Sequence, residues 1–147
     1  MASFAYLSQA DRDCLKKLSF PVVLPRELPG GWSAAPLELF EDQELCEVSL
    51  DASFLGPDRA NWSVVNTPGG IGDAIPGEQD ASHTLLQHPD FGQILVHFFS
   101  EEGRSEVLSD WFPEVEDASA YHSFRGSQVS RADLDRLVGN LTVYSGS

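Results

Sequence analysis

Four histidines are the side chains of this sequence best suited to proton transfer or metal binding near neutral pH. They are His83, His88, His97 and His122, and none has the H-x-x-x-H or H-E-x-x-H spacing that brings two imidazoles to one helix face. We assign no catalytic residue. If the protein is instead a small hydrolase or isomerase, His97 and His122 are the expected site, because both fall on predicted strands and can be neighbours. The competing interpretation is that each ring is satisfied in or beside the core.

A second group of polar residues lies close together in the sequence. His83, His88 and Asp90 are near enough to share a metal ion in a loop. Three polar side chains in a flexible segment are also commonly just solvated, and we predict that the protein has no metal and no cofactor. Together with Gly70 and Asp73, these residues instead form the predicted binding region.

The longest polar segment, residues 67–82, reads TPGGIGDAIPGEQDAS and is predicted to be a mobile loop that is functional or loosely ordered. Its glycines resemble a phosphate loop, but the G-K-[ST] continuation is missing and acids follow, so nucleotide binding is disfavoured. No G-x-S-x-G nucleophile elbow is present. Acidic pairs at 101–102 and 114/116 could support acid–base catalysis, but they fit solvated turns better.

Length and charge narrow the classes of function further. A chain of 147 residues with 41% hydrophobic residues predicts a single domain, residues 1–147, that can fill its own core. The formal net charge of −14 disfavours binding to nucleic acids or to anionic membranes, and it favours solubility. We expect no leader and no spanning segment, since no run approaches the roughly 20 apolar residues needed.

Because neither a leader nor a spanning segment is expected, the expected compartment is the cytoplasm. Cys14 and Cys46 form no C-x-x-C pair and each falls on an apolar stripe, so we predict two buried free thiols rather than a disulfide.

Hydrophobic periodicity predicts a helix at each end of the chain with strands between them. Ser8 begins an S-x-x-D cap for a helix to about Leu18, and Ser130 begins another for a helix carrying the apolar stripe Leu134, Leu137, Val138 and Leu141. The predicted strands are 32–40, 45–50, 61–66, 93–99, 105–112 and 121–125. Residues 51–58 are expected to be a loop, a helix over 105–111 is the alternative, and strand 93–99 is apolar on both faces and therefore expected mid-sheet.

These patterns predict an α+β fold: a curved, mainly antiparallel sheet with N-terminal and C-terminal helices packed on it.

Two segments resemble a known kind of domain. The sequence LPRELPGGW at 24–32 is similar to the "LP-x-x-LP-x-G-[WY]" opening of bacterial domains of unknown function, which include sensor-like portions of anti-sigma factors and lipoproteins. The sequence GSQVSRADL at 126–134 resembles the end of such domains. The resemblance implies an antiparallel sheet with flanking helices and no established catalysis.

Our functional hypothesis is a bacterial non-enzymatic binding or regulatory module that uses the open face of the sheet or the loop between Thr67 and Asp90. The partner is expected to be a protein or a small molecule, and the protein a monomer or weak homodimer. The histidine–carboxylate hydrolase or isomerase is the alternative.

Overall fold

A computed structural model describes residues 3–42, 47–68, 82–113 and 118–144 of the chain. The described residues form two α-helices, ten strands and one short 3₁₀ turn. In chain order these are α1 (Gln9–Lys16), β1 (Val23–Pro25), β2 (Ser33–Ala34), β3 (Glu38–Asp42), β4 (Glu47–Leu55), η1 (Pro57–Arg59), β5 (Asn61–Thr67), β6 (Ser82–His88), β7 (Gly92–Glu101), β8 (Arg104–Ser109), β9 (Tyr121–Ser127), α2 (Arg131–Gly139) and β10 (Leu141–Val143).

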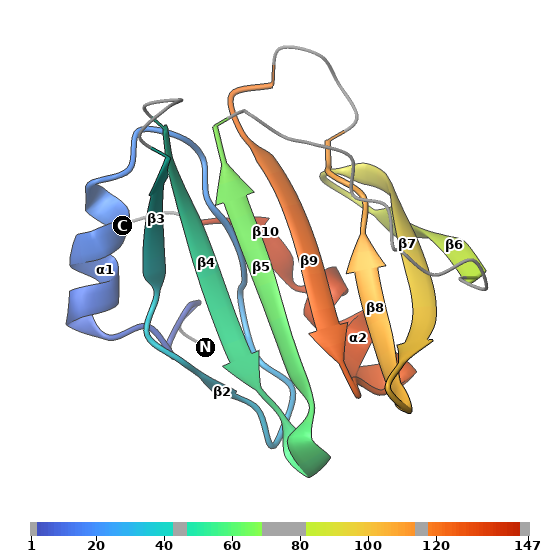
Figure 1. Cartoon of the computed structure of the whole chain (residues 1–147). Helices are drawn as coiled ribbons and strands as arrows, with labels where there is room; N and C mark the ends of the chain where they lie inside the picture. Colours follow the sequence, from blue (N-terminus) through green and yellow to red (C-terminus); the bar gives the residue numbers. More distant parts are fainter. Residues whose placement is uncertain (1–2, 43–46, 69–81, 114–117, 145–147) are drawn as a thin grey trace.

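The strands build one large sheet and one small one. The large sheet has eight strands in the order β2-β4-β5-β9-β8-β7-β6, with β3 paired to β4 beside β2 (Figure 1). Strands β1 and β10 pair in a separate two-stranded sheet. Every pairing between described strands is antiparallel. The α+β fold predicted from the sequence is confirmed.

The two faces of the large sheet differ in what covers them. On β5, Trp62 and Val64 are buried and alternate with the less buried Ser63 and Val65, as the period of two in a strand requires. The buried set defines the inner face, which packs in one hydrophobic cluster with the apolar side of α2 and with β1. Figure 1 shows α2 crossing behind β8 and β9. We call the opposite side, which no described helix covers, the open face.

Helix α2 begins at the predicted cap but ends at Gly139, so Leu141 of the predicted stripe lies in β10 instead. The backbone N–H of Asp133 donates to the Ser130 hydroxyl at 3.1 Å, and Leu134, Leu137 and Val138 are buried. The Asp133 carboxylate does not complete the capping box. It accepts instead from the indole N–H of Trp32 at 3.0 Å, which joins the segments 24–32 and 126–134.

Helix α1 has the complete capping box, in which the Ser8 hydroxyl accepts from the Asp11 N–H and Asp11 accepts from the Ser8 N–H. The other carboxylate oxygen of Asp11 accepts from the Leu37 N–H at 3.1 Å, which ties the helix to the segment before β3. Cys14 is a free thiol but only half-buried, so the prediction of a buried thiol was too strong. Cys46 lies outside the described residues.

Several predicted boundaries were wrong on the N-terminal side of the sheet. Residues 32–40 are not one strand, because the chain leaves β2 before Pro36 and re-enters the sheet as β3. The predicted loop 51–58 is instead the second half of β4 as far as Leu55, where Ala52 and Phe54 are buried on the inner face. The strands predicted at 61–66, 105–112 and 121–125 are present as β5, β8 and β9, although β8 ends at Ser109. The alternative helix over 105–111 was wrong.

Two further differences from the prediction concern β6 and β7, at the other end of the sheet. The strand predicted at 93–99 is β7, which lies next to the edge strand rather than in the middle. Its neighbour β6 was taken for part of a loop. The hairpin between them is closed by three residues, with His88 paired to Gly92 and Gly92 at φ +74°, a conformation that favours glycine. Strand β9 lies between β5 and β8.

The buried stripe of α2 yields a stability prediction. Leu137→Ala should lower the free energy of unfolding by about 2–5 kcal/mol, because Leu137 is fully buried and truncation leaves a cavity. Ser130→Ala should cost only about 1 kcal/mol, since it removes one capping bond. Urea denaturation of both variants measures the difference. A neutral Leu137→Ala variant would contradict the placement of α2 on the inner face.

Candidate functional site

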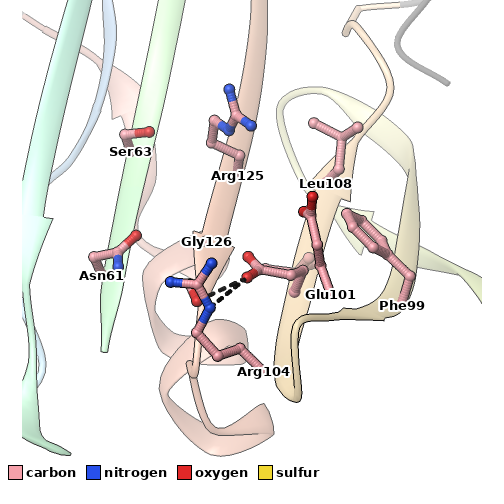
Figure 2. A pocket seen from close by; sticks show the side chains of 11 residues that line it. Asn61, Ser63, Phe99, Glu101, Arg104, Leu108, Arg125 and Gly126 are labelled. Carbon is pink, nitrogen blue, oxygen red and sulfur yellow. Dashed lines mark hydrogen bonds and ion pairs between the residues drawn. The ribbon is translucent and has the colours of Figure 1, made fainter. Parts of the chain in front are cut away.

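A groove of about 290 Å³ lies on the open face where β5, β9, β8 and β7 run side by side (Figure 2). Its lining combines neutral polar groups with two arginines, two glutamates and an apolar side. The lining side chains come from all four strands and are those of Asn61, Ser63, Phe99, Glu101, Arg104, Glu106, Leu108, Arg125 and Ser127, with Val107 and Gly126 below them.

Arg125 stands at one end of this groove because of the strand register. Its Cα is paired with Ser63 on one side and with Leu108 on the other. Its neighbours Phe124 and Gly126 face the core, so the alternation of β9 places the Arg125 side chain on the open face. A Cβ at Gly126 would come within 2.9 Å of the Asn61 carbonyl oxygen and of the Trp62 ring, so this position accepts only glycine without a shift.

The two arginines of the groove differ in whether their guanidinium groups form ion pairs. Arg104 contacts the carboxylates of Glu102 at 3.5 Å and Glu106 at 3.8 Å. Glu106 is held in place by the Ser127 hydroxyl at 3.0 Å. The exposed guanidinium of Arg125 makes no hydrogen bond or ion pair with any of the residues described, and Figure 2 shows it directed away from Arg104 and Glu101.

A partly buried carboxylate adjoins the groove on β4. Asp51 is paired across the strands with Glu38, and its Oδ1 is buried with no hydrogen-bond partner in the described structure. Burial, followed by repulsion from Glu38, raises the pKa of Asp51, while Arg125 and a hydrogen bond from Ser53 lower it. Arg125 is therefore the cation that faces this carboxylate pair, at a distance too long for an ion pair.

The predicted pair His97 and His122 is not brought together. His97 lies on the open face, where its Nε2 is 2.9 Å from the Asp110 carboxylate and its ring centroid 6.2 Å from that of His83. His122 lies on the inner face among aromatic rings and is only 3% exposed. All four histidines are described, and none lines the groove.

His122 belongs to a buried polar network with a structural role. The Asn66 amide accepts from the Val23 N–H at 2.7 Å through Oδ1 and donates to the Val23 carbonyl through Nδ2. That orientation makes Oδ1 an acceptor, so the Nδ1 of His122, 2.6 Å away, is the donor. Burial lowers the pKa of His122 to about 4, because the apolar surroundings disfavour the charged ring.

The predicted binding region is divided by the fold. His83 and His88 lie five residues apart in β6, so the strand alternation sends them to opposite faces. His88 is buried, with Nδ1 accepting from the Asp90 N–H and Nε2 donating to the Leu141 carbonyl at 2.9 Å. Gly70 and Asp73 lie outside the described residues. Within the described part of the chain, no three His, Cys, Asp or Glu side chains are grouped to hold a metal.

Arg125 was not predicted as a site residue from the sequence. A usable signal was present, because only Arg104 and Arg125 among the nine lysines and arginines lie in strands of the large sheet. Between the core residues Phe124 and Gly126, a cation on a central strand must face the uncovered side.

A second hollow of about 430 Å³ lies between the end of α1 and β3, near Leu18, Phe20 and Leu39. Pro68 and Val48 on its rim adjoin segments outside the description, so we build no site on it. No helix in the described ranges is long and apolar enough to span a membrane.

Comparisons with known proteins give little further information. No protein-family model matches the chain, and no curated protein matches it. One similar solved structure is that of MucB in complex with MucA(peri), at a TM-score of 0.41 and 13% sequence identity. The match covers 84% of this chain but only 36% of the other. Such a distant likeness carries no functional argument, and the family resemblance of segments 24–32 and 126–134 stays a prediction.

The buried His122 should make stability depend on pH. The unfolded ring has its ordinary pKa of 6.5, and the folded ring about 4. Above pH 7 both states are neutral at this residue and contribute no pH dependence. As pH falls from about 6.5 to about 4 the unfolded state binds the proton first, so roughly 3 kcal/mol of stability should be lost.

Urea denaturation between pH 7.5 and 4 tests this expectation. His122→Asn keeps a donor toward Asn66 but cannot titrate, so the loss over this range should shrink by about the same amount. His83→Gln, at an exposed position, is the matched control and should follow the wild type. An unchanged pH slope in His122→Asn would contradict the assignment.

Proposed function

We propose that this chain is a non-enzymatic protein-binding module whose binding surface is the open face of the large sheet, centred on Arg125. The observation that carries the proposal is a guanidinium that no described residue binds, lining a groove of about 290 Å³ on a face that no described helix covers. An arginine with its donors unused is suited to a planar carboxylate, which it can bind through two parallel hydrogen bonds.

The rest of the groove narrows the chemistry of the partner. Phe99 and Leu108 offer an apolar wall on the β8–β7 side, while Asn61 and Ser63 offer side-chain hydrogen-bonding groups on the β5 side (Figure 2). The occupant suggested by this lining is an extended protein segment with one carboxylate beside an apolar side chain. Because the chain carries a net charge of −14, a strongly acidic partner would be repelled, so the remaining charges of the segment should be few or positive.

The alternative, a histidine–carboxylate enzyme, has less support. Its best remaining element is the His97–Asp110 pair, whose side chains are 17% and 34% exposed on the open face. The second predicted catalytic residue, His122, is on the opposite face, where its Nδ1 is hydrogen-bonded to Asn66. A single His–Asp pair with no second histidine in hydrogen-bond reach favours binding over catalysis. The cytoplasmic location and the single-domain organisation stay predictions from the sequence.

Selection from a display library of random linear peptides tests the proposed function. Peptides that bind the wild-type protein should share an Asp, a Glu or a terminal carboxylate next to an apolar residue. Arg125→Ala should weaken their binding by about 10- to 100-fold, because a charge-assisted pair is lost. Isothermal titration calorimetry measures the affinity of the selected peptides for each variant.

Arg136→Ala is the matched control, since it makes the same change of charge at an exposed position on α2. It should leave the affinity unchanged. Peptides that bind Arg125→Ala as tightly as the wild type would contradict the proposal, and so would the absence of any selected peptide.

A further inference from the structure

Strand β6 ends the large sheet, and one of its edges is free in the described structure. It pairs with β7 over its whole length, from Ser82 opposite Phe98 to His88 opposite Gly92. No described strand pairs with its other side. In an antiparallel pair, alternate residues direct their N–H and C=O groups away from the partner, so this edge presents a row of unused backbone groups.

The composition of β6 is unusual for such an edge. Its seven residues, SHTLLQH, include no Lys, Arg, Asp, Glu or Pro, although charged residues make up 22% of the chain. Sheet edges are commonly protected by charges, prolines or bulges, which prevent another strand from adding to them. The ladder with β7 is continuous, with one residue opposite one throughout. The edge is thus regular, uncharged and open to pairing.

An exposed leucine lies at the middle of this strand. Leu85 is the fourth of the seven residues and is 51% exposed. It is paired with Leu95 of β7, and both side chains lie on the open face. A strand added at the edge would cover Leu85 and extend this apolar row.

We propose that a second copy of this chain pairs with β6, antiparallel and about a two-fold axis at Leu85. The two leucines then face each other, and His83 of each protomer lies opposite Gln87 of the other. No carboxylate meets another across the new ladder, because β6 contains none. The register is self-complementary, and because β6 carries no Lys, Arg, Asp or Glu, the new ladder adds nothing to the repulsion between two copies of net charge −14.

The pairing has a consequence that goes beyond the proposed function. Residues directly opposite in an antiparallel ladder point to the same face, so the open faces of both copies lie on one side of a continuous sheet. Two Arg125 grooves would then be presented together. The dimer could bind two segments of one partner with greater avidity than one groove provides.

Sedimentation velocity of the full chain over a range of concentrations and at two salt concentrations tests the dimer. The wild type should shift from monomer to dimer as its concentration rises. Dimerisation should strengthen with salt, because salt screens the repulsion between two acidic copies. Leu85→Lys should weaken it about tenfold or more, since it places two like charges directly opposite each other.

Leu55→Lys is the matched control, because Leu55 is 57% exposed but lies on β4, between β2 and β5. It should dimerise like the wild type. Circular dichroism of both variants checks that they fold. Hydrogen exchange gives a second readout that needs no variant: amides of residues 82–88 should become more protected as the wild-type concentration rises.

Three results would overturn the proposal. If the wild type stays monomeric at every concentration, β6 does not pair with a second copy. A dimer that survives Leu85→Lys would be built on another surface. If the β6 amides that point away from β7 are already protected in the monomer, the chain covers its own edge. None of these measurements uses a peptide, so their outcome is independent of the test on Arg125.

Discussion

The arrangement of the covering layer on the sheet depends on one buried side-chain amide. Asn66, on the central strand β5, binds both the N–H and the carbonyl of Val23 and thereby does for β1 what a neighbouring strand would do. Both residues are fully buried, so removing this amide would leave backbone groups without partners, which is costly. Strand β1 in turn pairs with β10, which follows α2 directly. One amide therefore sets the position of three elements.

The covering layer determines which face of the sheet is left for function. The inner face is occupied by α2, β1 and β10, and its polar residues His122 and His88 use ring nitrogens to bind Asn66 and the Leu141 carbonyl. Those hydrogen bonds tie the covering layer to the sheet. The open face keeps the groups with unused donors, above all Arg125. Structural roles and the proposed binding role are thus divided between the two faces of the same strands.

Local signals in the sequence were sufficient to predict the elements whose ends carry capping residues or turn glycines. The caps at Ser8 and Ser130 were predicted correctly, because a helix terminus is decided by contacts within one turn, and so were all members of the α2 stripe except Leu141. The neighbouring strands β7 and β8 were also predicted, and Gly103 at φ +78° favours the tight turn between them. Strand β6 was missed because SHTLLQH has no strict alternation, and only its pairing with β7 makes it a strand.

By itself, the sequence determined the fold class, the acidic surface and the two capped helices, all of which follow from composition or from neighbours in the chain. The tertiary structure decided the strand order, which placed β9 at the centre and β6 at the edge. It also decided the site, because strand register alone sets Arg125 between Ser63 and Leu108 and sends His97 and His122 to opposite faces. The physical reason is that pairing partners in a sheet are distant in sequence, and each one-residue step in register exchanges the two faces.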